Sequence, residues 1–175
     1  MVDIPTLETD RLRLRPYRLD DFDAYAQMWT EPAVVRFIGG VPFSREQSWT
    51  RFLRHFGLWQ HLGFGFFALE DKATGTLAGE CGFHDVKRTL TPSIEGTMES
   101  GWALVTRMQG RGLAEEAMRG AIGWAVDHGR GERFTAIVDP DNPASLRVAQ
   151  KLGFTEFARS EYAGHPVILL ERPRC

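Results

Sequence analysis

Hydrophobic positions in the first third of the chain change from a period of two to a helical period. Residues 7–15 alternate leucine with charged residues, which is typical of a strand with one buried face. The apolar residues that follow recur every three or four positions, which predicts a helix ended by Pro32. Ser44 and Gln47 have the spacing of a capping box and open a second predicted helix, whose pattern Gly63 breaks.

The middle of the chain reads as a run of strands. Strand-like segments cover residues 64–70 and 76–86 and are joined by a turn at residues 71–75. A loop over residues 89–96 then leads to a third strand at residues 99–105.

The longest amphipathic pattern, residues 112–128, has one apolar stripe and predicts a helix. A short strand rich in β-branched residues follows at 134–138. Asn142 and Pro143 begin another predicted helix, which Gly153 ends. Two final strands are expected at residues 155–161 and 166–171.

The predicted order is therefore β, α, α, β, β, β, α, β, α, β, β, which belongs to the mixed α/β (α+β) class. We expect a twisted, mostly antiparallel sheet of about seven strands flanked by about four helices. Only residues 99–138 form a clear βαβ unit, and such a unit makes its two strands parallel through a right-handed crossover.

Composition narrows the class of protein. The 175 residues suit a single domain over 1–175, with 43% hydrophobic and 25% charged residues. A net charge of −2 gives no basic face for nucleic acid, and no apolar run is long enough for a membrane span. Two cysteines are too few for a disulfide framework, and the start of the chain lacks the apolar region of a secretory signal. We expect a cytoplasmic protein.

The stretch QGRGLAEEA, residues 109–117, places two glycines directly before the longest predicted helix. The first amides of a helix lack internal partners, so a flexible turn there suits a phosphate. The dinucleotide fingerprint requires a third glycine where Glu115 stands, and the Walker A lysine is also missing. A phosphate site and a plain tight turn both remain open at this point.

Residues 109–114, Gln-Gly-Arg-Gly-Leu-Ala, resemble the Gln/Arg-x-x-Gly-x-Gly/Ala signature of the GNAT superfamily of acyl-CoA N-acyltransferases. Three longer stretches are similar to the RimJ/RimL-like branch of that family. They are LETDRLRLRPYRLDDFDAY at the start, GWALVTRMQGRGLAEEA in the centre and DNPASLRVAQKLGF near the end. The resemblance covers nearly the whole chain in the right order.

The resemblance implies a GNAT fold whose parallel central strands splay apart to hold acetyl-CoA as co-substrate. The pantetheine arm would bond to unpaired main chain near Leu104 and Val105, and the amides of residues 111–114 would hold the pyrophosphate. Asn142 would contact the coenzyme and can cap its helix as well. The implied coenzyme contacts are Leu104, Val105, Gln109, Gly110, Arg111, Gly112, Leu113, Ala114 and Asn142.

The candidate catalytic residues are fewer. The resemblance places Ser145 beside the thiol, where it would donate a proton to the departing sulfur; otherwise it is only a first-turn serine. Either Glu99 or Glu80 would deprotonate the amine through water, unless both are solvated carboxylates. His84 is a third option because its ordinary pKa is near neutral, and a chain of waters is a fourth.

No metal is expected, since Cys81 and His84 lack a second ligand pair. The resemblance implies transfer of acetyl to a primary amine, either a protein N-terminus or a small molecule, by direct attack in a ternary complex. Two alternatives stay open: a non-catalytic coenzyme A sensor or scaffold, and a nucleotide-binding protein. Neither nucleic acid nor membrane is an expected partner, and the chain would act as a monomer or homodimer.

Overall fold

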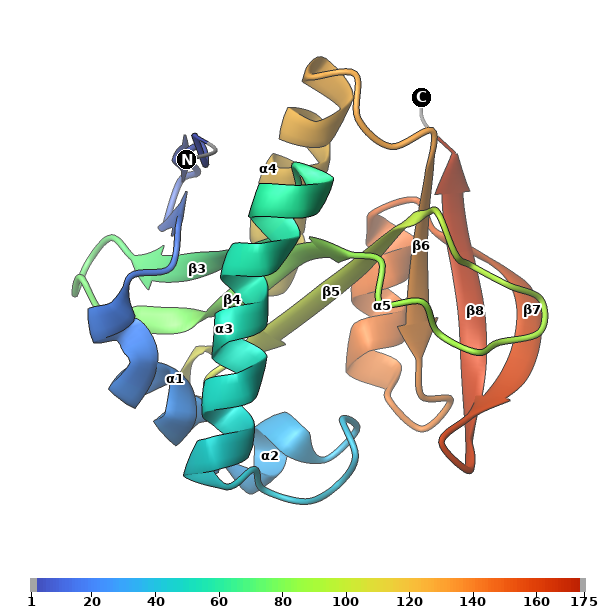
Figure 1. Cartoon of the computed structure of the whole chain (residues 1–175), viewed down its shortest axis with the longest axis horizontal. Coiled ribbons are helices and arrows are strands. Elements are labelled where there is room, and N and C mark those ends of the chain that lie inside the picture. The colour runs from blue at the N-terminus through green and yellow to red at the C-terminus, as the bar shows by residue number, and fades with distance from the viewer. Residues whose placement is uncertain (1–2, 174–175) are drawn as a thin grey trace.

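The computed structural model describes residues 3–173. Its centre is one sheet of eight strands in the order β1-β2-β3-β4-β5-β6-β8-β7 (Figure 1). The strands are β1 Leu7–Glu8, β2 Leu12–Arg15, β3 Phe66–Asp71, β4 Leu77–His84, β5 Met98–Leu104, β6 Arg133–Val138, β7 Thr155–Tyr162 and β8 His165–Pro173. The helices are α1 Phe22–Met28, α2 Pro32–Val35, α3 Arg45–Leu62, α4 Leu113–Asp127 and α5 Pro143–Lys151. Two 3-10 turns, η1 Leu19–Asp21 and η2 Thr106–Met108, complete the described elements.

The predicted mixed, mostly antiparallel sheet is confirmed, with two local differences. The expected strand over residues 7–15 is a hairpin, because the hydroxyl of Thr9 bonds both the N–H and the C=O of Leu12 and turns the chain. Pro32 does not simply end a helix: it occupies the first position of α2, where its missing N–H costs nothing.

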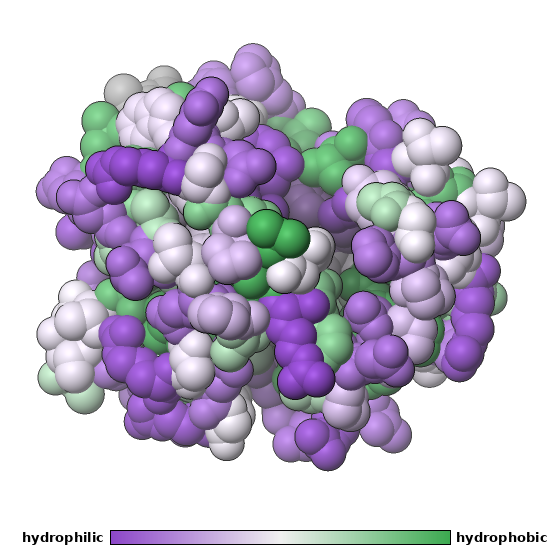
Figure 2. Space-filling view, turned by 90° about the horizontal axis from the view of Figure 1, so that it is seen from below, coloured by the Kyte–Doolittle hydropathy of each residue, from purple (hydrophilic) through white to green (hydrophobic). Residues whose placement is uncertain are grey.

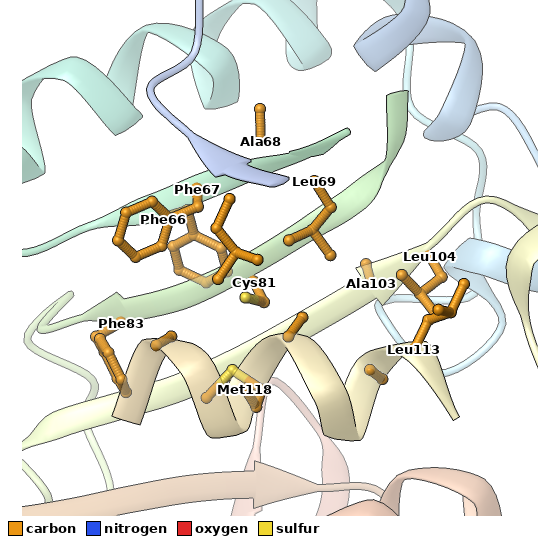
Figure 3. Close-up of a cluster of buried hydrophobic side chains, with 14 of the residues drawn as sticks. Phe66, Phe67, Ala68, Leu69, Cys81, Phe83, Ala103, Leu104, Leu113 and Met118 are labelled. Carbon is orange, nitrogen blue, oxygen red and sulfur yellow. The ribbon is translucent and has the colours of Figure 1, made fainter. Parts of the chain in front are cut away.

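Helices cover both faces of the sheet. In Figure 1, α1 and α3 lie in front of it and α4 lies behind. Along β3 and β4, alternate side chains point to opposite faces, and those of Phe67, Leu69 and Cys81 extend toward α4 (Figure 3). All three are fully buried. None of the helices within residues 3–173 is both long and apolar enough to cross a membrane.

The face of the sheet toward α3 buries a charged group. Glu80 of β4 is only 1% exposed, and it accepts a hydrogen bond from the Tyr17 hydroxyl at 3.1 Å. Arg51 Nη2 and His55 Nε2, both from α3, each lie 3.1 Å from one of its oxygens. Burial raises the pKa of Glu80, but His55 and Arg51 outweigh it and lower the value to about 2.

The two parallel strands separate soon after they meet. β5 pairs with β6 at only two positions, Met98 with Phe134 and Glu99 with Thr135. From Ser100 onward β5 continues beside β4 alone. The expected splay of the central parallel strands is therefore confirmed, and it opens toward the carboxyl ends of both strands (Figure 1).

We expect Gly101→Ala to destabilise the protein by about 1–3 kcal/mol, because the added Cβ would lie 2.8 Å from Cζ of Phe66 in the packed core. Gly123→Ala, in the middle of α4 with nothing within 4 Å, is the matched control and should stabilise by about 0.5–1 kcal/mol. Urea unfolding of both variants measures the difference. If both substitutions change the unfolding free energy equally, the Phe66 ring moves aside without cost and the prediction is wrong.

Glu80→Gln should lower the unfolding free energy by about 3 kcal/mol at pH 7, because it leaves the Arg51 charge unpaired. The pKa of Glu80 is lower in the folded than in the unfolded chain, so its contribution is present near neutral pH and is lost as the pH falls through the acid range. Urea unfolding from about pH 5 to about pH 3 should therefore show a steeper loss for the wild type than for the variant. Parallel curves would contradict this.

Candidate active site

A pocket of about 410 Å³ lies where β5 leaves β6. Its walls come from α2 and the residues after it, β5, the glycine turn before α4, and α5. Figure 2 views the molecule from this end, and apolar surface shows in a hollow between polar side chains. The lining residues are Ala33, Val34, Phe37, Ile38, Trp102, Ala103, Leu104, Gln109, Gly110, Gly112, Leu113, Ala114, Glu115, Asn142, Ala144, Ser145, Arg147, Val148 and Lys151.

The glycine turn presents main chain to this pocket. Gly110 and Gly112 have φ of +72° and +76°, a left-handed conformation that favours glycine. Gly112 is the N-cap of α4, and no side chain caps the helix there. A Cβ added at Gly110 would meet nothing within 4 Å, so the space in front of the turn is open. The first amides of α4 thus face a site suited to an anion.

Arg11, in the β1–β2 turn, holds this glycine turn in place. Its Nη1 donates to the carbonyl oxygen of Arg111 at 2.9 Å, and its Nε donates to Glu116 at 2.7 Å. Glu116 also accepts from the Thr9 hydroxyl at 2.7 Å. Nothing in the sequence pattern points to Arg11, because its partners lie about a hundred residues away.

The main chain of β5 corrects one expectation about the pantetheine arm. The N–H of Val105 already donates to Ala78 at 3.0 Å, and its carbonyl accepts from Met108 at 2.9 Å. Main-chain groups alternate between the two sides of a strand, so those of Leu104 and Trp102 point toward β6 instead. The Leu104 carbonyl accepts from the Gln109 side chain at 3.0 Å. The edge of β5 that has no neighbouring strand therefore carries the main chain of Trp102 and the amide of Leu104, and Val105 does not offer its amide.

Asn142 and Ser145 meet at the start of α5. The Asn142 Oδ1 accepts a hydrogen bond from the N–H of Ser145 at 3.1 Å, so Asn142 is the cap of the helix. Both residues line the pocket. The hydroxyl of Ser145 makes no hydrogen bond to any part of the chain that the structure describes, which leaves it free to act on a ligand.

Most of the predicted site residues come together around the pocket, and four do not line it. Eight are lining residues: Leu104, Gln109, Gly110, Gly112, Leu113, Ala114, Asn142 and Ser145. The amide of Val105 bonds to Ala78, on the side of β5 that faces β4. The side chain of Arg111 donates to the Met108 sulfur at 3.1 Å. Glu99 and Glu80 lie apart from the lining, in two different environments.

Glu99 lies where the splay begins, since it is the last residue of β5 that pairs with β6. Its carboxylate accepts from Arg88 Nε at 2.8 and 3.0 Å, and His84 Nε2 lies 2.9 Å from it. Burial raises the pKa of Glu99, but the contacts with His84 and Arg88 outweigh burial and lower it. Glu80, in contrast, is enclosed by Tyr17 and α3 and has both oxygens occupied.

Sequence reasoning missed the wall formed by α2 and the residues after it. Ala33, Val34, Phe37 and Ile38 all line the pocket. Glu31, just before α2, accepts from the N–H of Thr106 at 2.7 Å and so ties this wall to η2. The segment is too short to show helical periodicity. Arg147 and Lys151, in contrast, share one side of α5 at a spacing of four, a signal that would have identified the basic rim.

The site fits the parts of coenzyme A. The uncapped amides of α4 suit a pyrophosphate, the free edge of β5 suits an amide-bearing arm, and the apolar wall from α2 suits its methylene groups. Within residues 3–173, no three His, Cys, Asp or Glu side chains gather in a way that would hold a metal ion.

Comparison with known proteins agrees with this geometry. Residues 11–155 match the family model of the acetyltransferase (GNAT) domain. A putative GNAT-family acetyltransferase from Bordetella pertussis superposes with a TM-score of 0.85 at 32% identity, over 97% of this chain and 99% of that one. An uncharacterized N-acetyltransferase, p20, from Bacillus licheniformis is 28% identical over 85% of this chain and 82% of its own.

The RimL ribosomal L7/L12 α-N-protein acetyltransferase, solved in complex with coenzyme A, also shares the fold. Its TM-score is 0.79 at 19% identity, over 97% of this chain and 98% of that one. The mixed sheet with its splayed strands is thus the GNAT fold. The chain belongs to the GNAT acetyltransferase family, which transfers acetyl groups from acetyl-CoA.

Proposed function

We propose that this protein is an N-acetyltransferase that transfers acetyl from acetyl-CoA to a primary amine by direct attack in a ternary complex. The observation that carries the proposal is the continuity of one pocket from the glycine turn, along the free edge of β5, to Ser145. We also propose that residues 1–175 act as one domain, in the cytoplasm, as a monomer or homodimer.

Binding would follow from the groups already described. The amides at the start of α4 hold the pyrophosphate, with the Gln109–Ala114 turn as its cradle. The main chain of Trp102 and Leu104 bonds the pantetheine arm, and Asn142 lies beside it. When bound, the coenzyme supplies an acetyl thioester; the chain supplies the position of that thioester relative to the amine.

Ser145 is the proposed proton donor to the departing sulfur, because its hydroxyl lines the pocket and has no partner within residues 3–173. Of the two carboxylates expected near the amine, Glu99 lies at the start of the splay and is the one that can take part, directly or through a neighbouring group. Glu80 is left out of the mechanism. Its carboxylate is almost fully enclosed and is held by Arg51 and His55.

The proposed acceptor is a primary amine of one of two classes. RimL is named as an α-N-protein acetyltransferase, which supports a protein N-terminus. Small amines form the second class. A screen with a tetrapeptide that begins with serine, spermidine, and a set of small primary amines separates the two. Binding of acetyl-CoA with no release of coenzyme A in the presence of any amine would favour a coenzyme sensor.

Gly112→Val should abolish stabilisation by acetyl-CoA. The wild type should gain about 2.7 kcal/mol at a ligand concentration 100 times Kd. The variant should gain almost nothing, because valine is strained at φ +76° and the turn that orients the first amides of α4 must shift. Gly75→Val is the matched control, since Gly75 has φ +69° in the remote β3–β4 turn and equal backbone strain. Thermal melting with acetyl-CoA, coenzyme A, ATP and NAD tests this. Stabilisation by ATP or NAD alone would contradict the proposal.

Ser145→Ala should lower kcat about 100-fold and leave the affinity for acetyl-CoA unchanged, since only the proton to the leaving sulfur is lost. Ser145→Cys should recover part of kcat, because a thiol can also donate. Steady-state kinetics with the best amine of the screen measures both. An unchanged kcat in the alanine variant would show that Ser145 serves only the first turn of α5.

A further inference from the structure

Two buried carboxylates on the α3 face of the sheet have the same kinds of partner. Glu80 is held between Arg51 and His55, and Glu99 between Arg88 and His84. His84 lies opposite Glu99, and Glu80 lies opposite Ala103, so the strand register puts both carboxylates on one face. The Phe66 ring separates the two groups, 5.4 Å from the ring of His55 and 5.3 Å from that of His84.

The Glu80 group is closed. The side chain of His55 is 3% exposed, and its Nε2 lies 3.1 Å from Glu80 and 3.2 Å from the hydroxyl of Tyr25. Its Nδ1 is enclosed and has no hydrogen-bond partner in the described chain. Burial lowers the pKa of His55 more than the attraction of Glu80 raises it. This histidine has no route by which to exchange a proton with a ligand.

The Glu99 group is also buried but less closed, since the side chain of His84 is 9% exposed against 3% for that of His55. Nε2 of His84 is 2.9 Å from Glu99, whereas its Nδ1 has no partner within residues 3–173 and, unlike that of His55, is not an enclosed atom. The contacts with His84 and Arg88 lower the pKa of Glu99, and an ionised carboxylate can only accept. The imidazole proton therefore belongs on Nε2, which leaves the lone pair of Nδ1 available to solvent or a ligand.

The position of this pair matches the reaction centre. Glu99 is the last residue paired across the parallel strands, and the lining of the coenzyme pocket begins three residues later at Trp102. His84 flanks Glu99 on the face opposite α4. The coenzyme enters between the strands, so an amine that reaches the thioester from the α3 side would pass His84.

We propose that His84 is the general base of the reaction, and that Glu99 and Arg88 are positioning residues that fix its tautomer. The proposal rests on the acetyltransferase function proposed above. Other charged or titratable groups also lie around the pair. Asp85 comes from the loop after β4, Arg54 comes from α3, and Tyr162 of β7 lies under the Arg88 guanidinium at 4.6 Å.

The reaction would pass through one tetrahedral intermediate. The acceptor ammonium gives one proton to Nδ1 of His84, and the neutral amine then attacks the carbonyl carbon of the thioester, forming the C–N bond. When the intermediate collapses, the C–S bond breaks, Ser145 gives its hydroxyl proton to the sulfur, and the second proton of the nitrogen replaces it on Ser145 through water. The products are the N-acetyl amide, coenzyme A as a thiol, and a proton that His84 releases to water.

His84→Gln tests the proposal through the pH profile of kcat/KM, with the amine of the screen that the wild type uses fastest. About two pH units below the pKa of that amine, the variant should lose about 100-fold, because no group removes the proton. About one unit above that pKa the amine is already neutral, and the loss should shrink to about 5-fold or less. Stabilisation by acetyl-CoA should be unchanged throughout.

His55→Gln is the matched control, since it removes the same ring from the closed group. It should lower the thermal stability and leave the shape of the pH profile as in the wild type. Glu99→Gln should lower kcat/KM in the same pH range as His84→Gln but by less, because the imidazole keeps its place and loses the partner that fixes its tautomer. A loss of equal size at every pH for His84→Gln, or no loss at all, would overturn the role of His84. If the wild type neither binds acetyl-CoA nor acetylates any amine, the proposed acetyltransferase function is itself overturned.

Discussion

The short parallel pairing between β5 and β6 is the constraint on which the site depends. Two paired positions fix the strands at one end, and beyond them the main chain of β5 has no strand on that side. Unpaired backbone groups inside a protein need partners, so the gap either fills with ligand or with water. The glycine turn, α5 and α2 all border this gap: the turn contributes main chain, α5 contributes short polar groups and a basic rim, and α2 contributes an apolar wall.

The parts of the site that could be predicted from the sequence are those with local causes. The turn before α4 was visible because its two glycines stand directly before a long amphipathic pattern, and Asn142 with Pro143 is a local start signal. The exact edge of β5 was not predictable. Whether Leu104 or Val105 faces the gap depends on the register with β4, which a one-residue change reverses.

The two glutamates show the same limit in another way. In the sequence, Glu80 and Glu99 are equivalent acidic residues in neighbouring strands. They differ only through what packs on them: α3 closes over Glu80, while a loop and β6 leave Glu99 at the start of the splay. Similarly, Arg11 contacts the glycine turn and Glu31 contacts η2, in each case across a long stretch of sequence. A local sequence pattern cannot predict such contacts.

The contacts between the β1–β2 turn and α4 carry a consequence for the folding of the chain. Arg11 and Thr9 reach Glu116 across 105 and 107 residues, and the same arginine steadies the carbonyl of Arg111. Contacts between residues this far apart in the sequence form late in folding, because closing so long a loop costs conformational entropy. The contacts that hold the glycine turn are thus absent from any partly synthesised chain that ends before α4. An ordered glycine turn is therefore a sign that the first and middle parts of the polypeptide have folded together.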